Sequence, residues 1–383
     1  MKWKYQKARR GFLFTLGVVF FFSFSLIPVA QSRGEVIRSE KTDFRLVSVQ
    51  DGLEHPWALD FLPDGDILIT ERPGSLLRYS DGELQKIEGL PSLFASGQGG
   101  LLDVAVHPDF SRNKLVYFTY SAEGSGGAGT ALYRARLEEN RLKGGEVLYS
   151  LPQFSSSRVH FGSRIVFAPD GTIYMSIGER GARQRAQRLD DAAGSTLRLN
   201  DDGSIPEDNP FVDRDEALPE IYSYGHRNAQ GMAVHPDSGE VWQHEHGPRG
   251  GDEVNIIKAG KNYGWPKVSY GEEYSGGSIG EGAEAPGIEP PLLHWTPSIA
   301  PSGMTFYSGD LFPRWRGDLF VGALAGEHLR RVEFDGHEVM EQEVLLHRRI
   351  GRIRDVRTGP DGRIWLLTDA GNGGLYVIEP VDF

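Results

Sequence analysis

A short phrase recurs along the 383-residue chain and constrains its fold more than any other feature. Each copy contains apolar residues, then Pro-Asp-Gly or a close variant, then alternating apolar residues. Proline sets the backbone for a turn and Asp-Gly supplies the bend that follows, so each copy predicts a strand, a tight turn and a second strand. The copies run over 58–65, 104–110, 165–174, 232–242, 304–320 and 356–366.

The spacing of these copies predicts a repeat architecture. The central aspartates lie 45 residues apart from Asp64 to Asp109, 61 from Asp109 to Asp170 and 67 from Asp170 to Asp237. These are the lengths of propeller blades whose loops vary in size. Helical patterns are nearly absent, although 180–197 could hold a short helix or a long loop. We therefore predict an all-β fold, a six-bladed β-propeller with four-stranded antiparallel blades, as one domain over 40–383.

The first 32 residues read as an export signal. A cationic start is followed by an apolar run over 11–27 and by small residues at 30–32, where a peptidase could cleave. Arg9-Arg10 also fits a twin-arginine pattern. An uncleaved anchor is the alternative, since the apolar run is near the lower limit for crossing a bilayer. We expect a periplasmic or secreted protein whose mature form has no membrane span.

Composition excludes several classes of function. The formal charge of −12 argues against a nucleic-acid partner, because phosphate binding needs a basic surface. The chain has no cysteine, so disulfide frameworks, thiolate catalysis and cysteine-based metal sites are excluded.

Two loops carry candidate residues for chemistry, because propellers place function in the loops at one mouth of the channel. His160 lies just before a strand pair, where it could act as a base or be an ordinary structural histidine. Gln98 lies between Gly97 and Gly99, which would allow close approach to its amide, although a plain turn would read the same way.

Two arginine clusters suggest an oxygen-rich ligand. Arg227 and Asn228 place a cation beside an amide, a combination that binds carbonyl or carboxylate oxygens. Arg352 and Arg354 are two residues apart, so a strand would direct both guanidinium groups to one side. Such a pair suits a polyanion, and a surface salt-bridge pair is the alternative.

The segment 244–253 suggests a metal. His244 and His246 invite a zinc interpretation, but no third ligand follows at the usual spacing. The Gly247-Pro248 turn and the acidic residues after it suit a hard cation such as Ca²⁺ better.

Five phrases in order resemble a known enzyme family. They are Gly-Gln-Gly-Gly-Leu-Leu-Asp, His-Phe-Gly-Ser-Arg, Gly-His-Arg-Asn, His-Gly-Pro-Arg-Gly-Gly-Asp-Glu and Arg-Ile-Arg-Asp-Val. From about residue 55 to residue 377 the chain resembles the soluble aldose sugar dehydrogenases and soluble quinoprotein glucose dehydrogenases, which depend on pyrroloquinoline quinone (PQQ). The resemblance implies PQQ and Ca²⁺ as cofactors, an aldose sugar as substrate and an external electron acceptor. We expect a monomer or a homodimer.

The resemblance also implies a role for each matching residue. It implies oxidation of the sugar at C1 to the lactone, with hydride passing to the quinone and a proton to a histidine base. The catalytic residues would be His160 and Arg227. The cofactor-binding positions would be Gln98, Arg227, Asn228, Tyr274, Ala325, Arg352 and Arg354. The metal-binding residues would be Gly247 and Pro248 at one calcium and Glu253 and Tyr263 at a further one.

Three departures keep an alternative open. Val159 stands where some relatives have an acidic residue, and Ala325 stands where many have a lysine; His328 and Arg330 are the candidates to replace that lost cation. The segment 295–298 matches the family's aromatic wall only loosely. The alternative is a non-catalytic calcium-binding propeller that recognises a glycan or a protein. A propeller hydrolase such as a lactonase is disfavoured by the arginine pair.

Overall fold

The structure is a computed structural model that describes residues 1–2 and 35–382. The predicted export signal therefore lies outside the described residues, apart from Met1 and Lys2. In the part of the chain that is described, no helix has the length and apolar character needed to cross a membrane.

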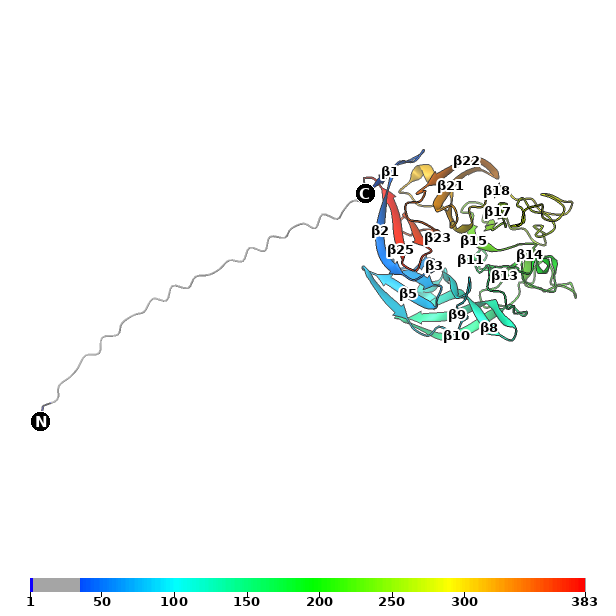
Figure 1. The fold of residues 1–383 in the computed structure, drawn as a ribbon. Helices are drawn as coiled ribbons and strands as arrows, with labels where there is room; N and C mark the ends of the chain where they lie inside the picture. The colour runs from blue at the N-terminus through cyan, green and yellow to red at the C-terminus, as the bar shows by residue number, and fades with distance from the viewer. Residues whose placement is uncertain (3–34, 383) are drawn as a thin grey trace. The chain divides into compact units, whose positions relative to one another are not determined.

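Six antiparallel sheets surround a central axis, so the predicted six-bladed β-propeller is confirmed (Figure 1). Blade 1 contains β3 (Pro56–Phe61), β4 (Ile67–Glu71), β5 (Ser75–Ser80) and β6 (Glu83–Ile87). Blade 2 contains β7 (Leu101–Val106), β8 (Leu115–Gly124), β9 (Gly127–Glu138) and β10 (Arg141–Ser150). Blade 3 contains β11 (Ile165–Phe167), β12 (Ile173–Ile177), β13 (Ser195–Leu199) and β14 (Ile221–Tyr224).

The remaining blades follow the same order, with the first strand innermost. Blade 4 contains β15 (Ala229–Val234), β16 (Val241–Glu245), β17 (Asp252–Ile256) and β18 (Leu293–Trp295). Blade 5 contains β19 (Pro301–Phe306), β20 (Leu319–Ala323), β21 (His328–Asp335) and β22 (Glu338–Leu345). Blade 6 contains β23 (Ile353–Thr358), β24 (Ile364–Thr368), β25 (Gly373–Pro380), β2 (Phe44–Leu53) and β1 (Val36–Ile37).

Every copy of the repeated phrase spans the turn between the first and second strands of a blade. The turn at 63–65, for example, joins β3 to β4, and Gly65 N donates to Leu62 O at 2.9 Å. Within 35–382 the helices are short: α1 (Phe110–Asn113), η1 (Arg183–Gln187) and η2 (Pro313–Trp315). The stretch 180–197 therefore holds a single short 3₁₀ turn, η1, within a loop.

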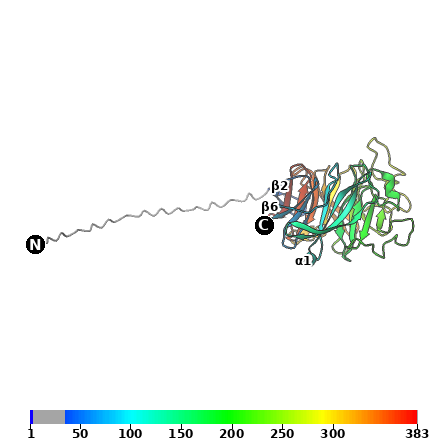
Figure 2. The same cartoon turned by 90° about the horizontal axis from the view of Figure 1, so that it is seen from below.

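The two ends of the propeller meet in blade 6. Strand β2 pairs with β25 from Phe44 opposite Pro380 to Leu53 opposite Gly373, and the blue and red strands lie side by side in Figure 1. This pairing closes the ring, because it joins the first and last parts of the propeller in one sheet. It also covers the edge of β25, whose backbone groups would otherwise be unpaired. Figure 2 shows the blades edge-on, with the connecting loops above and below the strands.

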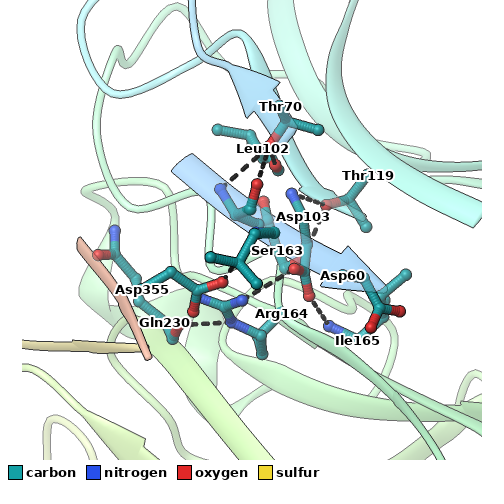
Figure 3. A network of polar contacts seen from close by, with 12 residues as sticks. Asp60, Thr70, Leu102, Asp103, Thr119, Ser163, Arg164, Ile165, Gln230 and Asp355 are labelled. Atoms are coloured by element: carbon teal, nitrogen blue, oxygen red, sulfur yellow. Dashed lines mark hydrogen bonds and ion pairs between the residues drawn. The ribbon is translucent and has the colours of Figure 1, made fainter. Parts of the chain in front are cut away.

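A buried charge network joins the blades at the centre (Figure 3). The Arg164 guanidinium, 1% exposed, lies 2.8 Å from Asp103 Oδ1 and 3.1 Å from Asp355 Oδ1 and donates to Gln230 O at 2.9 Å. These partners belong to blades 2, 6 and 4. Burial raises the pKa of Asp103, although Arg164 and Arg357 oppose that shift. The network ties together the innermost strands β7, β15 and β23, which are far apart in sequence.

Candidate active site

Loops from four blades enclose a cavity of about 530 Å³, a size suited to a small-molecule ligand. Its walls come from segments preceding β7, β11 and β15 and from the connections that follow β16, β17, β18 and β20. The lining residues are Gln98, His160, Arg227, Asn228, His246, Gly247, Pro248, Arg249, Gly250, Glu272, Tyr274, Thr296, Pro297, Ser298, Ala300 and Ala325.

Most of the predicted site residues meet at this cavity. Predicted residues that line it are Gln98, His160, Arg227, Asn228, Tyr274, Ala325, Gly247 and Pro248. Arg352 and Arg354 are not among the lining residues, and Glu253 and Tyr263 line a separate cavity. The roles assigned to these residues remain predictions.

His160 is held by a buried carboxylate that the sequence did not reveal. Its Nδ1 lies 2.9 Å from Glu179 Oε1, and the Glu179 side chain is 3% exposed. Glu179 follows β12 by two residues, so it reaches the histidine from inside the same blade. The His160 backbone is left-handed, with φ +55°, a conformation that is uncommon for residues other than glycine. An acid therefore contacts His160 although position 159 is a valine.

Gln98 contacts the backbone of the histidine loop. Its Oε1 accepts a hydrogen bond from His160 N at 2.8 Å, and its own N donates to Arg158 O at 2.8 Å. A Cβ added at Gly97 would lie 2.5 Å from Arg158 O, so glycine is required for the two loops to pack together. Gly97 therefore allows the loop that carries Gln98 to pack against the loop that carries His160.

Arg227 and Asn228 present buried donors without partners. Arg227 donates from NH1 to His246 O and Gly247 O at 3.1 and 3.2 Å, while its Nε has no hydrogen-bond partner in the described chain. Asn228 Oδ1 accepts from Gly162 N at 3.1 Å, and its Nδ2 is similarly unpartnered. Buried donors are normally satisfied, so these two beside a cavity favour a ligand with acceptor oxygens.

The Gly247 turn is braced by Asp252. The carboxylate accepts hydrogen bonds from Gly247 N at 2.9 Å, Ser298 Oγ at 2.8 Å and Ile299 N at 2.7 Å. Burial raises the pKa of Asp252 to about 6 despite these bonds. Asp252 therefore shapes the turn by accepting hydrogen bonds from its backbone and from the segment after β18.

The zinc interpretation of the neighbouring histidines finds no support in the geometry. His244 and His246 direct their Nε2 atoms to backbone carbonyls of β19, those of Ser302 and Pro301. Among the described residues, no three His, Cys, Asp or Glu side chains gather in a way that could hold a metal. Of the carboxylates in the described residues, Glu272 lines this cavity, so the protein ligands offered to a cation here are mostly backbone and neutral side-chain oxygens.

Arg352 and Arg354 face the same way, towards Asp369. Their NH2 groups lie 3.3 and 2.8 Å from Asp369 Oδ2, and Arg354 NH1 donates to Gln230 Oε1 at 2.9 Å. Burial alone would raise the pKa of Asp369, but the charges and hydrogen bonds of Arg354, His55 and Arg352 hold it well below its ordinary value. Sequence reasoning missed this carboxylate, which follows β24 directly.

Glu253 and Tyr263 line a second cavity of about 300 Å³. Glu253 lies opposite Glu245 in the β16–β17 pairing, and burial together with Glu245 raises its pKa well above the ordinary value. Asn255 Nδ2 donates to Glu253 at 3.2 Å, whereas Asn255 Oδ1 is buried without a partner in the described chain. Two facing carboxylates and a free amide oxygen are the ligands that Ca²⁺ prefers.

The two candidates to replace the lysine at position 325 do not line the main cavity. Ala325 lines this cavity, but neither His328 nor Arg330 does. His328 Nδ1 contacts Gly326 O at 2.9 Å instead. Arg249 supplies a cation at the mouth that the sequence did not single out.

Comparison with known proteins identifies the family. The family described as Glucose / Sorbosone dehydrogenase matches residues 53–377. The chain belongs to this family. It is 45% identical over 341 residues to aldose sugar dehydrogenase YliI of Escherichia coli, covering 87% of this chain and 92% of that protein.

Solved structures of the glucose/sorbosone dehydrogenase family superimpose on this fold. The apo form of the soluble aldose sugar dehydrogenase of Escherichia coli aligns with a TM-score of 0.86 at 43% identity, covering 88% of this chain and 99% of that one. The PQQ-bound aldose sugar dehydrogenase of Streptomyces coelicolor aligns with a TM-score of 0.73 at 28% identity, covering 88% and 98%. The resemblance that the five phrases carried is confirmed, and the chain is an oxidoreductase of this family.

Proposed function

We propose that this enzyme oxidises aldose sugars at C1 to the lactone, using PQQ and Ca²⁺ bound in the 530 Å³ cavity. The observation that carries the proposal is the meeting of a carboxylate-bound histidine with Arg227 and Asn228 on that cavity. The names of the relatives, one of them solved with PQQ, support the same function.

The chain's own donors fit the oxygens of PQQ. Arg227 Nε and Asn228 Nδ2 are buried donors without partners in the described chain, and Arg354 Nε is a third. Arg227 and Asn228 would hold the quinone oxygens, and Gln98 and Tyr274 would line the site. Arg352 and Arg354 would attract the carboxylates, a role they would share with their contact to Asp369.

His160 is placed to act as the base. With Nδ1 bonded to Glu179, we assign the imidazole proton to Nδ1, which leaves the Nε2 lone pair free. Nε2 would take the proton from the C1 hydroxyl of the sugar as the C1–H bond breaks. Glu179, being buried, would stabilise the imidazolium that forms. When bound, PQQ supplies the two-electron acceptor for the hydride, and Ca²⁺ withdraws charge from the quinone oxygen.

Two calcium sites are proposed, one at each cavity. The Gly247-Pro248 turn offers backbone oxygens for one ion, and Arg227 lies beside this turn. Arg227 and the ion would together stabilise the negative charge that develops in the reaction. Glu253 and the Tyr263 segment would hold a second ion away from the chemistry. We further propose a periplasmic or secreted location, an external electron acceptor that reoxidises the cofactor, and a monomer or homodimer.

Reconstitution tests the whole proposal. Purified protein would be mixed with PQQ and Ca²⁺ and assayed with glucose, xylose and maltose, with an artificial dye as electron acceptor. We expect sugar-dependent dye reduction that needs both additions. If no sugar reduces the dye while a known relative does so in parallel, the non-catalytic alternative replaces the enzyme.

His160→Ala tests the assignment of the base. We expect turnover to fall by at least about 10²-fold, because a general base usually accelerates a reaction by this factor or more. The PQQ affinity should be nearly unchanged. Dye reduction gives the rate, and titration of the PQQ absorbance gives the affinity. Unchanged turnover would remove His160 from the mechanism.

A further inference from the structure

Arg180 is a buried cation beside the proposed base, and it has no carboxylate partner among the described residues. The residue is 1% exposed and directly follows Glu179. Its Nε is buried and has no hydrogen-bond partner in the described chain. Burial lowers the pKa of Arg180 to about 10, so the group remains charged at neutral pH in a dry environment.

The guanidinium group is bonded to backbone carbonyls that lead to the histidine. NH1 donates to Val159 O, and NH2 donates to Ser157 O at 2.6 Å and to Ala128 O of β9 at 3.4 Å. The amide of Arg180 donates to His160 O at 3.3 Å. One residue therefore contacts both sides of the histidine loop and links it to blade 2.

The Arg180 side chain also packs against Phe161, the residue that follows His160. The guanidinium carbon lies 3.4 Å from the centroid of the buried Phe161 ring. A stacked guanidinium with several carbonyl acceptors is far more restrained than a lysine at the same place could be. His160 and Arg180 both have left-handed backbones, with φ +55° and +60°, so neither conformation would persist without such restraint.

We infer that Arg180 is a positioning residue for the proposed reaction: it holds the 157–161 loop so that the His160 imidazole stays on Glu179 and faces the cavity. The inference rests on the proposed function of His160. It gives a reason for burying a charge without a counter-ion, since carbonyl oxygens of the loop and of β9 accept hydrogen bonds from both terminal nitrogens of the guanidinium.

The first test needs no cofactor and no activity. Amide hydrogen exchange of the apo protein would be compared for wild type, Arg180→Met and Arg180→Lys, with Arg331→Lys as a control at a buried arginine of blade 5. We expect exchange over 157–163 to quicken by about tenfold in Arg180→Met and by less in Arg180→Lys. The control should change exchange in blade 5 and in the segment around Glu40, which pairs with Arg331, and leave 157–163 unchanged. Unchanged exchange over 157–163 in a folded Arg180 variant overturns the inference.

The second test separates positioning from general stability. In the reconstituted enzyme we expect kcat of Arg180→Met to fall by about 10–100-fold, while sugar KM and PQQ affinity stay within about threefold. If Arg180→Met does not fold, Arg180→Lys carries both tests, with kcat expected to fall by about three- to tenfold. Loss of PQQ affinity in step with kcat, or kcat within twofold of wild type, overturns the inference. An inactive wild type would instead refute the proposed function and leave the exchange test standing.

Discussion

At the scale of single residues, the partner decides what a histidine can do. His160 has a carboxylate on Nδ1 and a cavity beside it. In the described part of the chain, the hydrogen bonds of the His244 and His246 rings go to backbone carbonyls, and burial lowers the pKa of both residues, that of His244 to about 3. These two histidines therefore stay neutral at physiological pH and connect β16 and the residue that follows it to β19, although their spacing resembles a metal motif.

Glu179→Gln tests the partner of the proposed base. An amide at this position can donate to Nδ1 and so place the imidazole proton on Nε2, where it blocks proton abstraction. We expect kcat to fall by about 10²-fold or more, with PQQ affinity unchanged, as measured by dye reduction and absorbance titration. Glu179→Asp, which keeps the charge, is the control and should retain more activity. A fully active Glu179→Gln enzyme would contradict the role of the carboxylate.

Asp369→Asn tests the ion pairs that Asp369 forms with Arg352 and Arg354. The folded pKa of Asp369 is depressed, so its contribution to stability is complete above its unfolded pKa of about 4 and is lost as the pH falls towards the lower folded value. We expect wild type to exceed the variant by about 3 kcal/mol at pH 7 and by less at pH 3. Urea unfolding at pH 7, 5, 4 and 3 measures this. A difference that does not shrink between pH 5 and pH 3 would show that the carboxylate is not the titrating group.

At the scale of elements, the glycine-rich loop before β7 is shaped by contact with the histidine loop. Gly97→Ala would place Cβ 2.5 Å from Arg158 O. Gly144→Ala is the matched control, because Gly144 has φ +59° against +62° for Gly97 but has open space around it. We expect the control to lose only about 1 kcal/mol for its backbone, and Gly97→Ala to lose about 1–3 kcal/mol more together with activity. Equal losses in urea unfolding and equal kcat would show that the contact is unimportant.

The sequence predicted elements where local chemistry defines them. A Pro-Asp-Gly turn between apolar runs predicts a hairpin, and the structure has that hairpin at the start of each blade. Two features depended instead on distant pairing. Strand β2 joins β25 across more than 300 residues, and Glu179 reaches His160 only because β12 ends where it does. Neither contact leaves a local pattern in the chain.

At the scale of the whole molecule, the site exists because the ring is closed. Gln98, His160, Arg227 and Ala325 come from loops of blades 2 to 5, so each is placed by its own sheet and by the packing of that sheet on its neighbours. Sequence motifs could identify these residues singly. Their convergence followed only from the prediction of a propeller, since that fold directs equivalent loops to one mouth.

Arg164→Met tests whether the central charge network holds the ring together. The substitution roughly keeps the volume but leaves Asp103 and Asp355, both fully buried, with Arg357 as their one remaining cation partner among residues 35–382. We expect a loss of about 3–5 kcal/mol in the free energy of unfolding, the usual cost of breaking a buried pair. Tryptophan fluorescence in urea measures the unfolding, since the chain has seven tryptophans, one of which, Trp57, has its ring centroid 4.5 Å from the Arg164 guanidinium. Arg112→Met removes an exposed pair with Asp109 and should change stability by no more than about 0.5 kcal/mol. If the two variants unfold at the same urea concentration, the packing of the blades alone closes the propeller and the network contributes nothing measurable.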